Sequence, residues 1–371
     1  MVRRLTQASP RHGIEAWAYC LAEGRLAQTL REEGLPLRVF PSCCRFDIRA
    51  IGALARAIRR DRIELIQAHT SRTHLIARLL AMRLGIPNIT TIHSPIALDE
   101  NRGFSRHPWR ARIERLGRRW TDHICTVSRE ETERLAREEG VPRDKLSWIP
   151  NAVLPTEPLD RDGDRARLRQ WLRDHNLADD RFTVAMVAQM RPRKGPEVLL
   201  RAFGRWLRDG GQGLLLMIGD DEMVDGSSYL EGLRTLCRQL GIDAAVHFTG
   251  FLDSPWELAA GADLIALPSL FGEGQPLVLI EAMNHGVAIA VSDTAGNRET
   301  VVTGQTGWLH APGDDAALAR HIAEAAADPA ATLGRGDAGR RFCLERFTID
   351  HVMPLYRELY LKLVGARHTH P

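Results

Sequence analysis

Short hydrophobic runs alternate with segments of helical period along the whole chain. In the front half the runs cover Glu15–Leu21, Pro36–Pro41, Glu64–His69, Ile89–Ser94, His123–Ser128 and Leu146–Asn151. In the second half they cover Phe182–Met190, Leu214–Asp220, Ala245–Gly250, Ala262–Ser269, Ala288–Asp293 and Gly307–Ala311. Between runs, residues 48–60 and 71–84 carry apolar side chains three and four positions apart, which predicts helices. Strands alternating with helices predict the α/β class, with parallel sheets and right-handed crossovers.

The pattern occurs twice, and a length of 371 residues also favours two domains. The stretch Pro155–Asp164 is rich in Pro, Gly and Asp, as linkers are. We therefore expect an N-terminal domain over residues 1–154, a linker over 155–165 and a C-terminal domain over 166–345. Residues 346–371 are expected to form a helix that returns to the N-terminal domain.

Charge is distributed unevenly between the two halves. Residues 1–150 hold 27 Lys and Arg against 17 Asp and Glu, a net charge of +10, whereas the whole chain carries +3. A basic front half favours an anionic partner, such as phosphates, an acidic acceptor or an anionic membrane face. A general arginine bias without a single patch is the alternative. No nucleic-acid-binding motif accompanies the charge, so we expect no nucleic-acid partner.

The cellular compartment is predicted from targeting signals, apolar runs and cysteine spacing. The first residues show no signal peptide, and no apolar run reaches 18 residues. The six cysteines show no CxxC pair and no metal-ligand spacing, which favours buried thiols in a reducing compartment. We expect a cytoplasmic protein that needs no cofactor and no metal.

The densest group of polar residues follows one hydrophobic run, between Leu267 and Met283. In open parallel sheets ligands bind beyond the carboxyl ends of strands, so a site is expected here. Glu273 lies in a glycine-rich loop, and Glu281 lies about one turn into a helix predicted to begin near Pro276. The N–H groups at that helix start favour an anion such as a diphosphate. Eight helical steps span about 12 Å, too far for the carboxylate pair of a glycoside hydrolase.

At this point the sequence resembles the retaining glycosyltransferases of family 4, also called glycosyl transferases group 1, which have the GT-B fold. The resemblance rests on the two glutamates with seven residues between them, and on the following segments His285–Glu299 and Gly304–Asp314. It extends from about Leu21 to Tyr360. It implies two Rossmann-like, doubly wound domains that face a cleft. It also implies transfer of a sugar from a nucleotide-sugar donor to a glycan or lipid-linked acceptor, in cell-surface polysaccharide or lipopolysaccharide biosynthesis.

The resemblance assigns roles to the two carboxylates. Glu281 would bind the ribose hydroxyls, and Glu273 would contact the transferred sugar. Backbone groups near sugar and phosphate would come from Gly274, Gln275, Pro276 and Leu277. Neither carboxylate needs to be a covalent nucleophile, because the protein's part is to stabilise the departing diphosphate. The alternative is that both glutamates are ordinary helix charges.

Positive charge for the diphosphate is expected from the loop after Phe182–Met190. Lys194 followed by Gly195 matches the family. Gln189 stands where the family commonly has arginine, so Arg191 or Arg193 would substitute, and the sequence leaves the choice open. The alternative is a basic turn that caps the next helix.

In the front half, His93 matches a family histidine that faces the donor sugar, and the resemblance implies a catalytic role for it. His69 is a weaker candidate of the same kind. For both, a packed or capping histidine is the alternative.

The chain departs from the family at its start. The family begins with a strand, a glycine-rich loop and a long helix, but Met1–Gly13 resembles only the end of that helix. We therefore expect the first βα unit to be missing and the front sheet to lose a buried strand. Two other functions stay open: a non-catalytic or impaired nucleotide-sugar-binding protein, and a sugar-nucleotide epimerase.

The stretch Arg102–Arg119 is basic and amphipathic, with Phe104, Trp109, Ile113 and Leu116 as its apolar residues. It predicts either a peripheral contact with the inner face of the cytoplasmic membrane or a solvated helix face. The donor base, the sugar and the linkage are not specified by the sequence.

Overall fold

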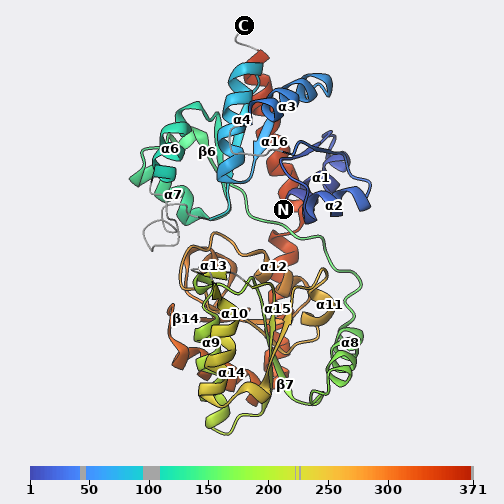
Figure 1. Cartoon of the computed structure of the whole chain (residues 1–371), viewed down its shortest axis with the longest axis vertical. Coiled ribbons are helices and arrows are strands. Elements are labelled where there is room, and N and C mark those ends of the chain that lie inside the picture. The colour runs from blue at the N-terminus through green and yellow to red at the C-terminus, as the bar shows by residue number, and fades with distance from the viewer. Residues whose placement is uncertain (42–46, 95–108, 222, 225–226, 369–371) are drawn as a thin grey trace. The chain divides into compact units, whose positions relative to one another are not determined.

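The structure, a computed structural model, describes residues 1–41, 47–94, 109–221, 223–224 and 227–368 (Figure 1). The chain divides into two compact units. Unit 1 comprises Met1–Leu154 with Phe347–Pro371, and unit 2 comprises Pro155–Arg346. Two of the six cysteines, Cys43 and Cys44, and Phe104 of the predicted amphipathic stretch lie outside the described residues.

Unit 1 contains six described strands in two parallel sheets. The strands are β1 (Ala18–Cys20), β2 (Leu37–Val39), β3 (Ile66–Ala68), β4 (Asn88–Ile92), β5 (His123–Thr126) and β6 (Leu146–Trp148). The helices are α1 (Val2–Ala8), α2 (Arg25–Glu32), α3 (Ile48–Arg60), α4 (Ser71–Leu84), α6 (Trp109–Gly117), α7 (Arg129–Glu138) and α16 (Ile349–His368). One sheet pairs β1 with β2, and the other has the order β3-β4-β5-β6. Among the described strands, none joins these two sheets.

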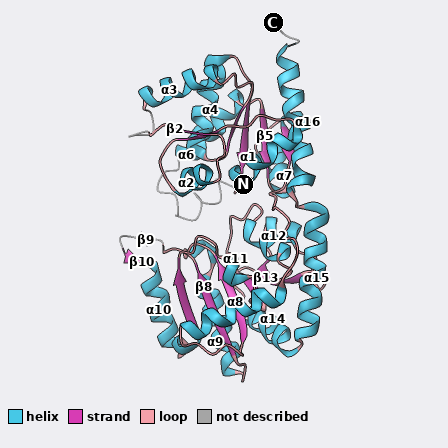
Figure 2. Ribbon diagram, turned by 90° about the vertical axis from the view of Figure 1, so that its right-hand side faces the viewer, coloured by secondary structure: helices cyan, strands magenta, loops and turns pink. Residues whose placement is uncertain are grey.

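Unit 2 contains one six-stranded parallel sheet with helices on both faces (Figure 2). Its strands are β7 (Phe182–Val187), β8 (Gly213–Ile218), β11 (Val246–Gly250), β12 (Leu264–Leu267), β13 (Ala288–Ser292) and β14 (Gly307–His310). Its helices are α8 (Arg161–Asp174), α9 (Pro196–Arg208), α10 (Tyr229–Leu240), α11 (Trp256–Ala259), α12 (Leu277–Asn284), α13 (Ala295–Thr300), α14 (Asp315–Ala327) and α15 (Pro329–Arg346). The strand order is β11-β8-β7-β12-β13-β14.

The predicted pattern of elements is confirmed in both units. Each of the twelve hydrophobic runs overlaps a strand, the sheets formed by these strands are parallel, and α3 and α4 have the predicted bounds. A short antiparallel pair, β9 (Met223–Val224) with β10 (Ser227–Ser228), was not predicted. Two-residue strands leave no periodic signal in a sequence.

The predicted linker is shorter than expected. Helix α8 begins at Arg161, inside the stretch 155–165 that was predicted to be a linker. The Asp160 side chain accepts a hydrogen bond from the Gly163 N–H and caps the helix. Asp162 and Asp164 lie in the first turn, where acidic side chains suit the positive end of the helix dipole. The residues whose composition predicted a linker thus form the start of a helix.

Helix α16 completes the core of unit 1, beside α1 (Figure 1). Its side chains Val352, Met353 and Tyr356 are fully buried and pack in one cluster with Leu5 of α1 and Ile89 of β4. The chain enters α16 beside the end of the first half, because Val153 exchanges backbone hydrogen bonds with Phe347 and Ile349. A core of unit 1 is therefore built from both ends of the chain.

A buried ion pair fastens α6 to α4. Arg78 is 1% exposed and donates two hydrogen bonds to the Glu114 carboxylate, at 2.6 and 3.2 Å. Its Nε donates to Thr121 Oγ1 at 2.7 Å. Burial would raise the pKa of Glu114, but His74 and Arg78 outweigh it and lower that pKa to about 2. Glu114 therefore stays ionised against its partner.

Buried histidines are held neutral in the folded chain. Burial lowers the pKa of His93, His123 and His310 to about 4 each. The unfolded chain therefore binds protons at a higher pH than the folded one does, and stability must rise with pH across this range.

We expect the free energy of unfolding to be constant above pH 7 and to fall between about pH 6.5 and 4. For the buried His310, a pKa shift from 6.5 to about 4 corresponds to about 3 kcal/mol of unfolding free energy that is lost as the pH falls. His310→Val should therefore flatten this dependence. The check is the thermal unfolding midpoint from pH 8 to 4, and an equally steep curve for the variant would contradict the assignment.

Candidate functional site

The strand order of unit 2 reverses between β7 and β12, which are neighbours in the sheet. Crevices at the carboxyl ends of strands form at such reversals and bind ligands. The loop with Arg191, Arg193 and Lys194 follows β7, and the loop with Glu273 follows β12. The two predicted loops thus meet at the position where the topology favours a site.

Glu273 is the centre of a cluster formed by these loops. Lys194 Nζ donates to Glu273 Oε1 at 2.7 Å, and Ser269 Oγ donates to the same oxygen at 2.7 Å. Arg193 Nη1 lies 3.4 Å from that oxygen and donates to the Gly272 carbonyl at 2.9 Å. Glu273 is 6% exposed, so its charge depends on these partners.

The charged groups of the cluster shift one another's pKa. Burial would raise the pKa of Glu273, but Lys194 and Arg193 outweigh it and lower that pKa. Burial lowers the pKa of Lys194, and Glu273 only partly opposes this. Two cations beside one carboxylate leave a net positive charge, which suits an anionic ligand.

Two glycines allow these loops to lie so close. Gly195 has φ +69°, and a Cβ there would lie 2.2 Å from the Pro268 carbonyl oxygen. Gly296, on α13, would place a Cβ 1.0 Å from the Gly274 carbonyl oxygen. Any larger side chain would move the backbone beside Lys194 or Glu273.

Helix α12 begins at Leu277, as predicted, and presents its N-terminus after the Glu273 loop. The backbone of Gly274, Gln275 and Pro276 precedes it and is buried. Glu281 lies one turn into this helix and accepts a hydrogen bond from Trp256 Nε1 at 2.9 Å. The helix start and Glu281 could hold an anion and a polyhydroxylated group of one ligand.

The structure separates the two candidate arginines. Arg193 contacts the Glu273 loop, whereas Arg191 donates to the Gln189 side chain. Arg193 is therefore part of the cluster with Lys194, and Arg191 lies in the same loop with a different partner.

His93 lies in unit 1, directly after β4, and forms a pair with His69, which follows β3. His69 Nδ1 and His93 Nε2 are 3.0 Å apart, so one ring donates and the other accepts. The rings stack with centroids 5.3 Å apart. Burial lowers the pKa of both, so the pair is neutral at pH 7. His69, the weaker prediction, is thus the hydrogen-bond partner of His93.

Sequence reasoning missed three contributors: Ser269, Trp256 and Gly296. Ser269 ends a hydrophobic run, a position that could have marked it. Trp256 and Gly296 gave no signal, because their contacts are made with residues 25 and 22 positions away in the chain.

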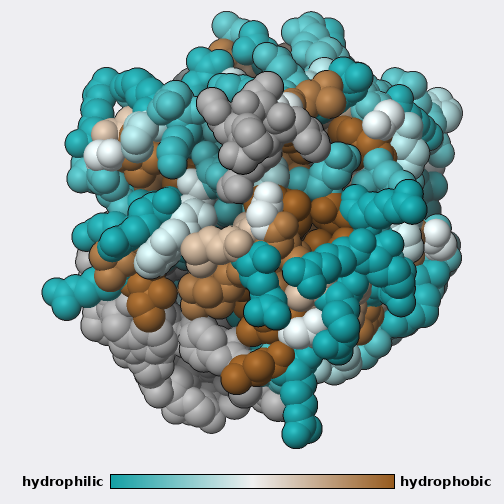
Figure 3. All heavy atoms as spheres, turned by 90° about the horizontal axis from the view of Figure 1, so that it is seen from above, coloured by the Kyte–Doolittle hydropathy of each residue, from teal (hydrophilic) through white to brown (hydrophobic). Residues whose placement is uncertain are grey.

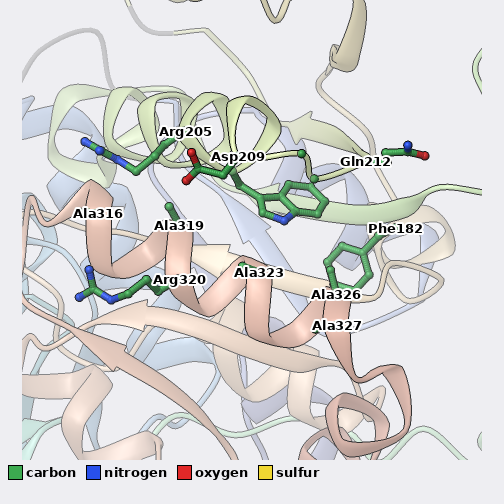
Figure 4. A pocket seen from close by; sticks show the side chains of 13 residues that line it. Phe182, Arg205, Asp209, Gln212, Ala316, Ala319, Arg320, Ala323, Ala326 and Ala327 are labelled. Carbon is green, nitrogen blue, oxygen red and sulfur yellow. The ribbon is translucent and has the colours of Figure 1, made fainter.

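One cavity of about 670 Å³ lies elsewhere in unit 2 (Figure 4). Phe182, at the amino end of β7, lines it together with Trp206 and alanines of α14. Lys194 follows the opposite end of β7, so this cavity does not belong to the candidate site.

Two family models match the chain. The one described as "Glycosyltransferase Family 4" matches residues 1–157, and the one described as "Glycosyl transferases group 1" matches residues 169–341. No helix in the described part of the chain combines the length and the apolar character needed to cross a membrane.

Two of the named relatives are a mannosyltransferase and a D-inositol 3-phosphate glycosyltransferase. A GDP-mannose-dependent alpha-(1-6)-phosphatidylinositol monomannoside mannosyltransferase of Mycolicibacterium smegmatis is 31% identical over 64% of this chain and 61% of its own length. A D-inositol 3-phosphate glycosyltransferase of Nocardia farcinica is 29% identical over 75% of this chain and 62% of its own length. The chain thus spans about three fifths of the length of these two relatives.

Solved structures share the fold. The Anabaena Alr3699/HepE structure in complex with UDP-glucose has a TM-score of 0.83 at 22% identity, over 97% of this chain and 96% of its own. The lipopolysaccharide outer core galactosyltransferase WaaB has a TM-score of 0.69 at 16% identity, over 98% and 95%. The predicted architecture of two Rossmann-like domains is confirmed by these matches.

Proposed function

The chain belongs to glycosyltransferase family 4, with the GT-B fold, and from this membership we propose that it transfers a sugar from a nucleotide-sugar donor. The acceptor is a glycan or a lipid-linked sugar, and the product enters cell-surface polysaccharide or lipopolysaccharide biosynthesis. The observation that carries the proposal is the Lys194–Glu273–Arg193 cluster at the reversal of strand order, beside the start of α12. A net positive, largely buried cluster of this kind suits a diphosphate.

Each predicted residue has a place in the proposed reaction. Lys194, Arg193 and Arg191 hold the diphosphate together with the N–H groups at the start of α12. Glu273 contacts the transferred sugar, and Glu281 accepts hydrogen bonds from the ribose hydroxyls. His93, oriented by His69, is proposed to face the donor sugar.

The proposed transfer retains the configuration of the sugar. The bond between the anomeric carbon and the phosphate oxygen breaks, and the acceptor oxygen bonds the same face of that carbon. The acceptor proton passes to the departing phosphate oxygen. Side-chain cations and helix N–H groups supply the stabilising charge, so no metal is required.

The experiment is a thermal-shift panel of UDP-, GDP- and ADP-sugars, followed by an assay of nucleoside diphosphate release with and without acceptors. Binding with acceptor-dependent release supports a transferase. Binding without release would instead indicate a non-catalytic binding protein. Conversion of the sugar nucleotide without an acceptor would indicate an epimerase.

We also propose that unit 1 meets an anionic membrane face through α6. Of the predicted amphipathic stretch, residues 102–108 and the Trp109 side chain lie outside the described residues. The described outer face carries two adjacent rows at positions three and four apart. The apolar row, 40–55% exposed, is Ile113 and Leu116 of α6 with Trp120 of the 3-10 helix Arg118–Trp120 that follows it. The basic row is Arg112 and Arg115 of α6 with Arg119 of the same 3-10 helix.

Exposed apolar side chains alone do not indicate a membrane, since they occur elsewhere on the surface too (brown in Figure 3). The adjoining basic row distinguishes α6. Arg115 also lies 3.4 Å from Glu139, whereas Arg119 lies over the Trp120 ring at 5.0 Å. An apolar row beside arginines suits the interface of an anionic bilayer.

We expect the protein to sediment with phosphatidylglycerol vesicles and not with phosphatidylcholine vesicles. Arg112→Gln/Arg119→Gln should lower the partition coefficient about thirtyfold, since two lost arginines at about 1 kcal/mol each amount to about 2 kcal/mol. Leu116→Ser/Trp120→Ser should lower it about tenfold or more, since it removes two apolar side chains from the contact. Leu361→Ser, at an exposed position of α16, is the control. Equal binding by all variants would contradict this contact.

A further inference from the structure

Trp256 links two short helices of unit 2 by a hydrogen bond. It is the first residue of α11, and its indole Nε1 donates to Glu281 Oε2 at 2.9 Å, across to α12. Leu258 and Ala259, further along α11, are buried and anchor the helix. Trp256 is itself half-buried.

A second contact orients the indole ring. The His285 ring stacks on it with centroids 5.2 Å apart and planes 9° from parallel. His285 lies four positions after Glu281, one turn further along, so both residues face α11. Burial lowers the pKa of His285, so at pH 7 the ring is neutral and does not compete with the indole for the carboxylate.

We propose that Trp256 is a positioning residue that orients the Glu281 carboxylate for the ribose hydroxyls of the donor. This inference rests on the proposed function, in which Glu281 accepts hydrogen bonds from the ribose. The last torsion of a glutamate side chain has a broad energy minimum, so the carboxylate plane is not fixed by its own rotamer. The indole N–H on a stacked, anchored ring restricts that plane before the nucleotide arrives, which lowers the entropy cost of binding.

The two carboxylates of the site thus accept hydrogen bonds from donors of different charge. Glu273 accepts from a cation and a hydroxyl at 2.7 Å, in the cluster that is proposed to meet diphosphate and sugar. Glu281 accepts from the neutral Trp256 donor. A neutral donor orients the carboxylate without cancelling its charge, and a charged acceptor binds hydroxyl donors more strongly than a neutral one does.

The test compares a nucleoside diphosphate with its 2′-deoxy form. Isothermal titration calorimetry measures the Kd of UDP and of 2′-deoxy-UDP, or of GDP and 2′-deoxy-GDP if the guanine nucleotide binds. We expect the wild-type chain to bind the ribose form at least tenfold more tightly, as one hydrogen bond to a charged group permits. Trp256→Phe keeps an aromatic ring against His285 but removes the N–H donor, and should reduce this ratio about threefold or more.

Three further variants make the result specific. Glu281→Gln should reduce the ratio as well, and the double variant should be no worse than Glu281→Gln, because both changes act on one interaction. Trp171→Phe is the matched control. The Trp171 ring, on α8, also stacks on a histidine ring, that of His175 at the C-cap of the same helix, with centroids 3.8 Å apart. The ratio of this variant should equal that of the wild type.

The outcomes separate the inference from the proposed function. If the wild type prefers the ribose form and Trp256→Phe retains the full ratio, Trp256 does not position Glu281, and the proposed function stands. If the wild type binds no nucleoside diphosphate, the proposed function fails and the inference fails with it. A general loss of affinity for both forms at an unchanged ratio would assign Trp256 a merely structural role.

Discussion

Replacing Lys194 with alanine is expected to lower kcat/KM for sugar transfer by about 10²–10³-fold, the cost of losing one group that stabilises a developing negative charge. Lys194 Nζ lies 2.7 Å from Glu273 Oε1 in a largely buried cluster. There a departing diphosphate gains more from each cation than it would in water. The measurement is nucleoside diphosphate release at several donor concentrations, so that kcat and KM are separated.

Three controls accompany this substitution. Lys362→Ala removes the same charge from an exposed position of α16 and should leave the rate unchanged. Lys194→Met keeps the aliphatic part of the side chain but not the charge, so it should be as inactive as Lys194→Ala. Circular dichroism should show both Lys194 variants folded, because Arg193 and Ser269 still contact Glu273. Full activity of a folded Lys194→Ala variant would remove Lys194 from the site.

The second large effect is expected on stability, from the ion pair that fastens α6 to α4. Arg78→Met leaves the buried carboxylate of Glu114 without the guanidinium that donates to it at 2.6 and 3.2 Å. Removing one partner of a buried pair costs about 3–5 kcal/mol. Hydrogen exchange of the peptides that cover α4 and α6, measured in increasing urea, would report this loss locally.

The matched control replaces both partners. Arg78→Met/Glu114→Met removes the unpaired charge together with the pair, and apolar replacements of buried ion pairs are often neutral. The double variant should therefore recover most of the stability that Arg78→Met loses. If the double variant is as unstable as the single one, packing against Gly117 rather than charge pairing explains the effect, since a Cβ there would lie 2.5 Å from Arg78 Nη1.

Much of the fold could be predicted from the sequence because it depends on local patterns. The strands of unit 2 are nearly continuous hydrophobes, and α3 and α4 carry clear helical periods. Asp160 shows where such reasoning fails. A composition of Asp, Gly and Pro is typical of linkers, but the same aspartates cap and begin α8.

The candidate site could be predicted only as separate pieces. Glu273, Glu281 and Lys194 were each marked by their positions after a strand or at a helix start. That Lys194 bonds Glu273, 79 positions away, depends on β7 and β12 being neighbours, which no local pattern encodes. The Trp256–Glu281 bond and the His69–His93 pair are contacts of the same long-range kind.

The placement of α16 in the core of unit 1 bears on how the chain is made. Ribosomes deliver the chain from its N-terminus, and domains fold as units once their residues are available. Unit 2 is continuous from Pro155 to Arg346, so it can close while synthesis is still under way. Unit 1 begins first but is completed after unit 2, because Val352, Met353 and Tyr356 cover its apolar cluster only once α16 has emerged. Until then the exposed cluster is a target for chaperones.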